Sequence, residues 1–308
     1  MQGIVYKSTG SWYNVLDENG QFRNARIKGK LKIDTDISST NPIAVGDIVL
    51  FNEDESGERD CTITAIRDRR NYIVRVSPHN RNQKHIVAAN IDQALLIVTI
   101  AEPRTSHGFI DRFLLTAEAY HIPAFIIVNK TDILKEKHRE QLEYWNDMYA
   151  SAGYEVIPMV ARDKESVAAL ADKLKGKTTL FSGHSGVGKS TLINQLIPGI
   201  GLKTTEVSDW SGKGQHTTTF AEMFDLPDGG RIIDTPGVKE FGLIDIEKEE
   251  LSHYFPEMRS VLNQCRFNNC LHLNEPGCAV KDAVAKEVIF EDRYFSYATI
   301  LESIGQKW

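Results

Sequence analysis

Residues 183–190 read Gly183-His184-Ser185-Gly186-Val187-Gly188-Lys189-Ser190, which matches the pattern G-x-x-x-x-G-K-[ST]. An apolar run at 178–182 precedes this stretch, and a helical pattern at 191–196 follows it. Strand, glycine loop and helix in this order are the context of a P-loop, whose backbone N–H groups enclose a phosphate chain at a helix N-terminus. Lys189 then reaches the β- and γ-phosphates, and the Ser190 hydroxyl ligates Mg²⁺. The stretch predicts a nucleoside triphosphate site; the alternative is a glycine-rich turn that matches by chance.

A second motif, Asn129-Lys130-Thr131-Asp132, selects the base and directly follows an apolar run at 124–128. The Asp132 carboxylate can accept hydrogen bonds from the N1–H and the amino group of guanine. Adenine offers neither donor there and would leave a buried carboxylate unpaired. Asn129 is expected to tie the loop together and to face the base edge. The motif predicts guanine, and a P-loop ATPase with a misleading N-K-x-D is the alternative.

Two further segments complete the predicted nucleotide site. Ala161 lies in Val160-Ala161-Arg162, at the place where GTPases of this type carry a Ser-Ala-Lys-like loop whose backbone N–H contacts the guanine oxygen. Asp234-Thr235-Pro236-Gly237 matches D-x-P-G, in which the acid holds Mg²⁺ through water and the glycine N–H contacts the γ-phosphate. The predicted nucleotide-binding residues are Asn129, Lys130, Thr131, Asp132, Ala161, Gly183, His184, Ser185, Gly186, Val187, Gly188, Lys189, Ser190, Thr191 and Gly237.

A switch segment is expected at 212–219, which begins with glycines and ends in three threonines. A switch threonine closes on Mg²⁺ and the γ-phosphate and is released after hydrolysis. We assign Thr218 to Mg²⁺ together with Ser190 and Asp234, and Thr217 or Thr219 are the alternatives.

The order of the motifs indicates a circular permutation, because N-K-x-D precedes the P-loop, whereas most small GTPases have the P-loop first. Apolar runs and helical patterns alternate from residue 94 to residue 182. This alternation predicts an α/β P-loop GTPase with a doubly wound parallel sheet and right-handed crossovers. Permutation leaves the site intact because these loops meet at one edge of the sheet.

Before the GTPase region, five short β-type runs at 4–6, 12–16, 21–27, 44–51 and 61–66 predict a small barrel of the OB type. A basic stripe lies on its third run and the loop after it: Arg23, Arg26, Lys28, Lys30 and Lys32. The stripe is either an RNA-facing surface or a solvated strand face. The basic stretch 67–85 is expected to be a linker or mobile loop that could contact phosphates.

After the GTPase region, Cys265-x4-Cys270-x-His272-x5-Cys278 supplies three thiolates and one imidazole. Four protein ligands suffice for a closed tetrahedral site, so we expect one structural Zn²⁺ per chain. Buried free cysteines beside an unrelated histidine are the alternative. A long helical pattern follows, and its expected buried residues are Val284, Val288, Tyr294, Tyr297, Leu301 and Ile304. A small zinc-binding helical domain is predicted.

Composition narrows the function classes further. A net charge of −6 gives no overall case for nucleic-acid binding, so any such surface must come from local clusters. No run of eighteen apolar residues and no signal-peptide pattern is present, so we expect a cytoplasmic protein without a membrane partner. We also expect it to be monomeric. The expected domains are 1–68 (OB-fold, RNA-binding), 69–245 (permuted GTPase) and 246–308 (zinc-binding).

Taken together, these motifs closely resemble one family, the circularly permuted, ribosome small-subunit-dependent GTPases called RsgA or YjeQ. The resemblance covers the whole chain and departs only in the Ser-Ala-Lys-like loop. It implies a factor in late maturation of the 30S subunit that contacts 16S rRNA and hydrolyses GTP with stimulation by the subunit. A GTP-gated RNA-binding module whose hydrolysis is incidental is the alternative.

The chain lacks the catalytic glutamine that Ras-like enzymes carry after their D-x-x-G motif. Val238 follows Gly237 at the position of their water-orienting glutamine, and an aliphatic side chain cannot orient water, so intrinsic hydrolysis should be slow. The resemblance points to His216 as the catalytic residue, acting when the switch is ordered on the ribosome. The alternative is that His216 only packs against or caps the switch.

Overall fold

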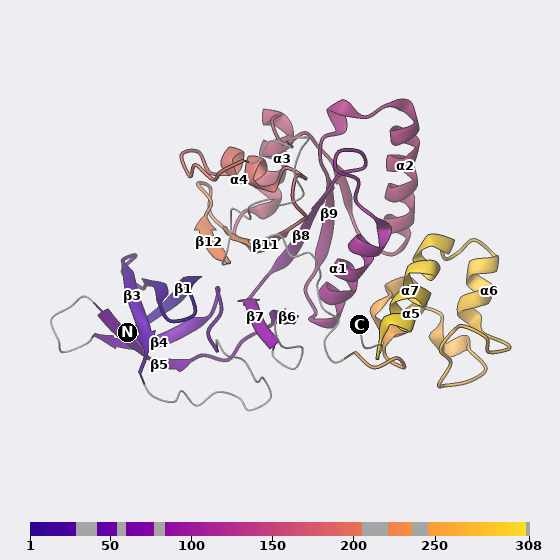
Figure 1. The fold of residues 1–308 in the computed structure, drawn as a ribbon, viewed down its shortest axis with the longest axis horizontal. Coiled ribbons are helices and arrows are strands. Elements are labelled where there is room, and N and C mark those ends of the chain that lie inside the picture. Colours follow the sequence, from indigo (N-terminus) through magenta and orange to yellow (C-terminus); the bar gives the residue numbers. More distant parts are fainter. Residues whose placement is uncertain (29–41, 54–59, 77–83, 205–220, 236–245, 306–308) are drawn as a thin grey trace.

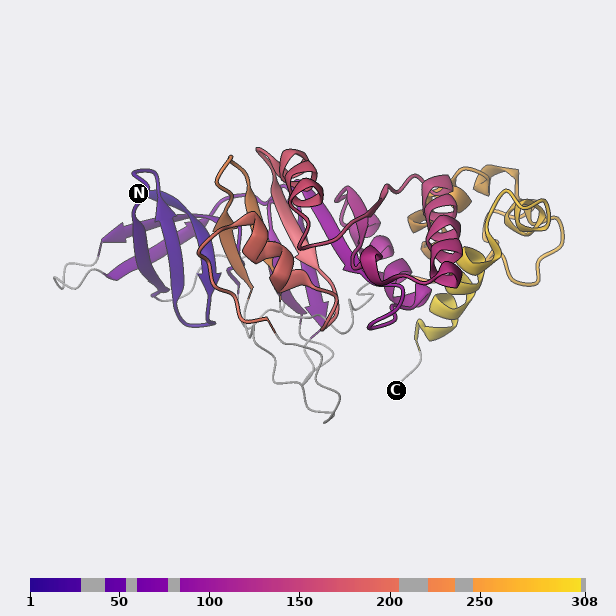
Figure 2. The ribbon, with the colours of Figure 1, turned by 90° about the horizontal axis from the view of Figure 1, so that it is seen from above.

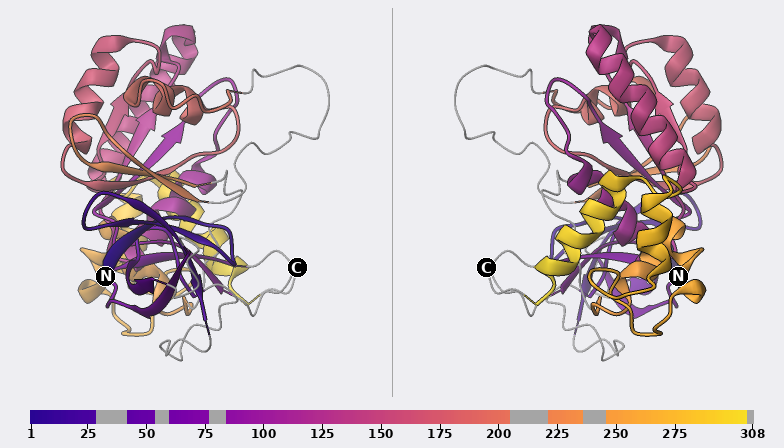
Figure 3. Two further views of the ribbon diagram at one scale, coloured as in Figure 1. Left: turned by 90° about the vertical axis from the view of Figure 1, so that its left-hand side faces the viewer. Right: turned by 90° about the vertical axis from the view of Figure 1, so that its right-hand side faces the viewer.

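The computed structural model describes residues 1–28, 42–53, 60–76, 84–204, 221–235 and 246–305. A small barrel stands at one end, a sheet flanked by helices in the middle, and a group of short helices at the other end (Figure 1). The view from above shows the three parts in a row, in the order of the chain (Figure 2). Viewed from either end, the barrel covers one end and the C-terminal helices the other (Figure 3).

The N-terminal part is a closed five-stranded barrel, as predicted. Its strands are β1 (Gln2–Ser8), β2 (Tyr13–Asp17), β3 (Phe22–Ile27), β4 (Ile48–Glu53) and β5 (Asp60–Ile66). They pair in the order β1-β2-β3-β5-β4, and β4 pairs with β1 to close the barrel. Alternate side chains face inward and form an apolar core that includes Val5, Val15, Val49 and Ile63.

The expectation of a linker at 67–85 is wrong for part of that stretch. A hairpin follows the barrel, formed by β6 (Tyr72–Val76) and β7 (Lys84–Ala89) in antiparallel pairing. Its apolar residues Ile73, Val74 and Ile86 are buried, and this packing outweighs the proline, histidine and asparagines between the two strands that suggested a loop. Pro78, one of the residues that suggested the loop, lies outside the described residues.

The central sheet is doubly wound, as predicted. Its strands are β8 (Gln93–Val98), β9 (Ala124–Val128), β10 (Val156–Pro158), β11 (Thr178–Ser182), β12 (Glu222–Asp225) and β13 (Arg231–Asp234). They pair in the order β10-β9-β8-β11-β13-β12, and all pairs are parallel except the antiparallel pair β13–β12. At one register position, β12 also pairs with β1, so the barrel and the central sheet are hydrogen-bonded to each other.

Helices cover both faces of this sheet. The helices are α1 (His107–Ala119), α2 (Glu136–Ser151), α3 (Lys164–Leu174) and α4 (Lys189–Leu196). Helices α1 and α2 share one apolar cluster with the strand residues Leu96 and Ile126. Helices α3 and α4 share another with Leu95 and Ile127, the neighbouring residues of the same strands. Strands buried on both faces explain why the sequence showed continuous apolar runs there.

The C-terminal part consists of short helices. They are η2 (Leu251–Tyr254), α5 (Pro256–Arg259), η3 (Leu262–Gln264), α6 (Ala279–Ala285) and α7 (Glu291–Ser303). One further short helix, η1 (Thr131–Ile133), belongs to the central part, where it follows β9.

The predicted long C-terminal helix is therefore two helices, α6 and α7. Glu287 has a left-handed backbone (φ 59°) that ends the first of them. The expected burial of Val288 is wrong, because its side chain in this connection is 62% exposed, whereas Tyr297 and Leu301 are buried. None of the helices among the described residues combines the length and apolarity that a membrane span requires.

Candidate functional site

The predicted nucleotide-binding loops lie at the carboxyl ends of neighbouring parallel strands. Asn129 follows β9, Ala161 lies beyond β10, the loop at 183–188 follows β11, and Asp234 ends β13. Ligands of doubly wound sheets bind at this edge. The fold therefore gathers four segments that are separated by up to about a hundred residues in the chain.

Asn129 connects three of these segments. Its Nδ2 donates to the Val187 carbonyl at 2.8 Å, and its Oδ1 accepts from the Ala161 N–H at 2.9 Å. The side chain is 2% exposed, so both bonds are withdrawn from water. The tie expected from the sequence is therefore present, and it extends to the phosphate-binding loop. Asp132 is exposed, so its carboxylate is open to a base.

Glycine is required at two positions of the loop 183–188 because the backbone approaches other groups closely. A Cβ on Gly188 would lie 2.3 Å from Asn129 Nδ2, and this residue has φ 96°. A Cβ on Gly183 would lie 2.6 Å from the Ile97 carbonyl oxygen. Both side-chain-free positions keep the loop against the ends of β8 and β9.

Lys189 and Asp234 form the charged centre of the site. The Lys189 ammonium donates to the Asp234 carboxylate and, at 2.6 Å, to the Thr235 carbonyl. Burial raises the pKa of Asp234, and the attraction of Lys189 opposes that rise without cancelling it. A carboxylate on β13 and the Ser190 hydroxyl on α4 are hard oxygen donors of the kind that Mg²⁺ prefers. These residues therefore fit the predicted Mg²⁺ site.

Sequence reasoning missed a contact between this loop and the segment after β8. Thr105 is 2% exposed, and its Oγ1 lies 2.7 Å from His184 Nε2. His184 Nδ1 faces the Ser185 carbonyl at 3.2 Å, so the ring carries its proton on Nδ1 and accepts from the Thr105 hydroxyl. Burial lowers the pKa of His184, and the charge of Lys130 lowers it further. Thr105 belongs to no recognisable motif, so this contact could not be predicted from the sequence.

The same segment also receives Lys130 of the base-selecting motif. Lys130 has a left-handed backbone (φ 63°), and its Nζ donates to the Glu102 carbonyl at 2.6 Å. The segment between β8 and α1 thus contacts both the phosphate-binding loop and the base-selecting motif.

Several predicted site residues lie outside the described part of the chain. These are His216, the switch threonines Thr217, Thr218 and Thr219, and Gly237. Their roles stay predictions.

The four predicted zinc ligands come together in the C-terminal part. The ligand atoms of Cys265, Cys270, His272 and Cys278 all lie within 4.8 Å of one another. His272 Nδ1 is 3.3 Å from Cys278 Sγ and 3.7 Å from Cys265 Sγ. Tetrahedral zinc with bonds of about 2.0–2.3 Å separates its ligands by roughly 3.5–3.8 Å, so the spacing fits this ion.

Local structure orients these ligands. His272 has φ 59°, and its carbonyl accepts from the Tyr294 hydroxyl at 2.7 Å. Burial lowers the pKa of His272, which favours the neutral imidazole that binds metal. Burial raises the pKa of the Cys270 thiol to about 12, so a bound cation must supply the attraction that removes its proton.

The basic residues of the barrel are less free than their sequence suggests. Arg23 has no acid beside it in the stripe, but the fold brings Asp17 to 3.0 Å and Glu53 to 3.4 Å. Arg26 lies over the Trp12 ring, 5.4 Å from its centroid. Trp12 is 40% exposed, so this pair presents an aromatic face and a cation together.

The second basic stretch is also partly neutralised. Arg69 forms two 2.7 Å hydrogen bonds with the fully buried Asp47, and Arg70 pairs with Asp92 at 2.7 Å. These contacts fix the connection between barrel and central sheet, which accounts for part of the basic charge there.

Comparison with known proteins gives two family matches. The model described as "RsgA GTPase" matches residues 66–244, and the one described as "RsgA N-terminal domain" matches residues 2–59. A relative from Flavobacterium psychrophilum, named "Small ribosomal subunit biogenesis GTPase RsgA", is 51% identical over 98% of this chain and 93% of its own. A relative of the same name from Bacteroides fragilis is 49% identical over 98% of this chain and 96% of its own.

Solved structures agree over the full length. The crystal structure of YjeQ from Thermotoga maritima has a TM-score of 0.78, is 32% identical and covers 99% of both chains. YloQ, described as a circularly permuted GTPase, has a TM-score of 0.73 and 28% identity, and the match covers 100% of this chain and 96% of that one. The permuted order of motifs is thus shared with a protein of known structure.

Proposed function

The chain belongs to the RsgA family of GTPases, and from that premise we propose that it hydrolyses GTP to GDP and phosphate and acts in biogenesis of the small ribosomal subunit. The observation that carries the proposal is the meeting of the P-loop, the N-K-x-D loop and Asp234 at one sheet edge, where Asn129 bonds the Val187 carbonyl and Lys189 bonds Asp234. Its partners are the 30S subunit and, within it, 16S rRNA. The protein works as a monomer in the cytoplasm.

Guanine selection rests on Asp132. Its carboxylate is exposed at the rim of the site, while Asn129 holds the loop from beneath. Two donors on the guanine edge match the two oxygens of this carboxylate. The Ala161 N–H already donates to Asn129, which places the backbone of that loop beside the base-selecting motif.

The phosphates are bound by the loop 183–190. Lys189 pairs with Asp234. The phosphates of a nucleotide would be further partners for the Lys189 ammonium, and Asp234, Ser190 and Thr218 would hold Mg²⁺. Bound Mg²⁺ would neutralise charge that develops on the phosphate oxygens. The Lys189–Asp234 pair leaves neither of these two largely buried charges without a partner.

Hydrolysis needs a group that orients water, and we assign this role to His216. Val238 cannot perform it, so the isolated protein should turn over slowly. Contact with the 30S subunit brings the switch into place and accelerates the reaction, after which the GDP form leaves the subunit.

The first test is steady-state GTP hydrolysis by the protein alone, with 30S subunits and with 50S subunits at equal concentration. Stimulation by 30S only supports the proposal. No stimulation by either would leave a GTP site but remove the ribosomal partner. An ATP competitor at the same concentration as GTP tests the nucleotide, and effective competition would contradict guanine selection.

The second test is His216→Ala, with His121→Ala as its control. His121 is exposed in the connection after α1, on the edge of the sheet opposite the site. The His216 variant should bind GTP and the subunit but lose stimulated turnover and stay bound to 30S. Normal release would favour a GTP-gated binding module in which hydrolysis is incidental.

The C-terminal cluster holds one structural Zn²⁺ in this proposal. Four protein ligands leave no open position for substrate, so the ion would serve the fold rather than the reaction. The barrel supplies RNA contacts through the pair Trp12–Arg26. Substituting Arg26 and Lys28 by Ala should reduce the salt dependence of subunit binding, and an unchanged salt slope would make this face a solvated surface.

A further inference from the structure

Helix α1 contacts the P-loop at its first turn and the C-terminal domain along its length. Thr105, just before the N-cap Ser106, bonds His184 of the P-loop. The ring of Phe109, in the first turn, packs edge-on against the same His184 ring with centroids 5.4 Å apart. The beginning of α1 therefore holds one residue of the phosphate-binding loop by a partly buried hydrogen bond and a ring contact.

A buried arginine of α7 holds the body of the same helix. The Arg293 side chain is 2% exposed, and its Nη1 donates to Asp111 of α1 at 2.5 Å. Its other donors reach Glu257 of α5 at 2.7 and 3.2 Å. Its guanidinium lies 4.7 Å from the centroid of the Phe255 ring. Because a buried charge that loses its partner is strongly destabilising, these bonds fix α7 and α5 to α1.

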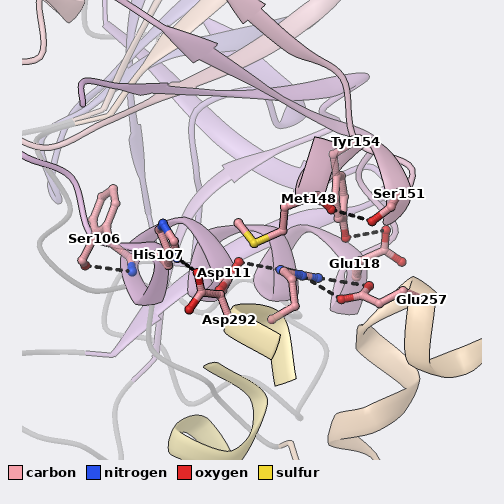
Figure 4. A network of polar contacts seen from close by, with 11 residues as sticks. Ser106, His107, Asp111, Glu118, Met148, Ser151, Tyr154, Glu257 and Asp292 are labelled. Atoms are coloured by element: carbon pink, nitrogen blue, oxygen red, sulfur yellow. Dashed lines mark hydrogen bonds and ion pairs between the residues drawn. The ribbon is translucent and has the colours of Figure 1, made fainter. Parts of the chain in front are cut away.

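Two more contacts extend this attachment to both ends of α1. His107, the first residue of the helix, accepts from the Trp145 indole at 2.6 Å and faces Asp292 of α7 at 3.4 Å. Near the other end, Glu118 pairs with Arg259 at 3.2 Å. Figure 4 shows His107, Asp111 and Glu118 along one helix, with Asp292 of the C-terminal domain beside His107 and with Glu257 on a neighbouring helix of that domain.

We propose that α1 is a rigid link through which the C-terminal domain positions the P-loop, with Asp111 and Arg293 as positioning residues for nucleotide binding. The link runs from Arg293 to Asp111, along α1 to Thr105, and from Thr105 to His184. Asp111 lies four residues after His107, the first residue of α1, which is about 6 Å along the helix axis, so it acts on the loop through the helix and not by contact. The inference rests on the proposed function, since it concerns the same nucleotide site.

A thermodynamic consequence follows from this arrangement. If docking of the C-terminal domain strengthens nucleotide binding, bound nucleotide must strengthen docking by the same factor. A partner that shifts the C-terminal domain would then change nucleotide affinity without touching the site.

The test is a double-mutant cycle read by the affinity for fluorescent GDP. Asp111→Asn keeps the shape of the side chain and leaves Arg293 its Glu257 partner, and Thr105→Val removes the hydroxyl that bonds His184 and also accepts from the Thr99 N–H. Each single change should weaken GDP binding about fivefold, and the double variant should bind within about twofold of Thr105→Val alone. Thr105→Ser should restore the affinity. The proposal would be overturned if the losses of GDP affinity in the two single variants multiplied in the double variant. A folded Asp111→Asn variant with unchanged GDP affinity would also overturn it.

Lys173→Ala is the matched control, because Lys173 pairs with Glu155 at the surface, away from α1. Its effect on GDP binding should be small and should multiply with that of Thr105→Val. If Asp111→Asn does not fold, Asp292→Ala takes its place in the cycle, since the Asp292 side chain is 46% exposed and its loss should be tolerated. The same two outcomes then decide.

Amide hydrogen exchange distinguishes the proposed link from a purely structural role of α1, because a structural role would not make exchange in α7 depend on GDP. GDP should slow exchange in residues 291–303 of the wild-type protein and leave it unchanged in Thr105→Val at saturating GDP. If GDP leaves the amide exchange rate of residues 291–303 unchanged in the wild-type protein, the proposed link is wrong. Failure of the wild-type protein to bind GDP at all would instead remove the proposed function, so the two failures are distinguishable.

Discussion

Asn129 Nδ2 donates to the Val187 carbonyl at 2.8 Å, which joins the base-selecting loop to the phosphate-binding loop through a buried bond. The Gly188 backbone passes so close that a Cβ there would lie 2.3 Å from the same nitrogen. The two loops that we propose to bind the base and the phosphates therefore share one contact, and disturbing it should affect both functions.

Gly188→Ala is expected to weaken GTP binding strongly and to lower the melting temperature. The added methyl group meets Asn129, and the left-handed backbone at φ 96° costs roughly 1–2 kcal/mol for a residue with a side chain. Gly199→Ala is the matched control, because Gly199 has φ 89° and open space around its Cβ position. Nucleotide titrations that give both variants the same affinity would show that the contact with Asn129 is unimportant.

Asp132→Asn is expected to exchange guanine for xanthine. The asparagine amide offers one acceptor and one donor, which match the N1–H and the C2 carbonyl of xanthine but oppose the amino group of guanine. Affinity for GTP should fall about ten- to hundredfold, and affinity for xanthosine triphosphate should rise. Because Asp132 is exposed, the melting temperature should stay unchanged. Retained GTP preference in competition binding would place the base elsewhere.

His184 is expected to make stability fall in acid. Burial lowers the pKa of His184 in the folded protein, so between this value and about 6.5 the unfolded chain takes up a proton that the folded one does not. The contribution of His184 to the free energy of unfolding is complete above about pH 6.5 and is lost as the pH falls below it. His184→Gln, which keeps an acceptor for Thr105 but cannot titrate, should reduce the difference in melting temperature between pH 7.5 and 5.5. An unchanged difference would assign it to other groups.

The sheet and the barrel could be predicted from local pattern. Runs apolar on both faces, such as 94–98, indicate strands covered on both sides, and the fold confirms this with helices on each face. The hairpin β6–β7 could not be predicted in the same way. Its burial depends on packing against other parts of the chain. The neighbouring Arg69 and Arg70 pair with Asp47 and Asp92, two acids that lie outside the basic stretch 67–85.

The site divides along a similar line. Asn129, Lys189 and Asp234 belong to motifs whose spacing states their chemistry, and the fold brings them together. Thr105 belongs to no motif, because its role comes from the place where the segment after β8 passes the P-loop. The predicted burial of Val288 was wrong for a related reason. Helical spacing indicated burial, but Glu287, directly before it, has a left-handed backbone that interrupts the helix.

Cys270→Ala is expected to lose bound zinc, as measured by metal analysis of the purified protein. Three remaining ligands cannot close the tetrahedron that Cys265, His272 and Cys278 form with Cys270. The loss should unfold the C-terminal domain, because this cluster lies in the same apolar core as Tyr297 and Leu301.

Cys61→Ala is the matched control, since Cys61 is equally a buried free cysteine but lies in the barrel core. It should keep one zinc per chain and lose only a small amount of packing. If α1 links the two sites, the Cys270 variant should also bind GDP more weakly, whereas the Cys61 variant should bind normally. Full zinc content in Cys270→Ala would refute the site, and zinc loss with unchanged GDP affinity would separate the metal from the nucleotide.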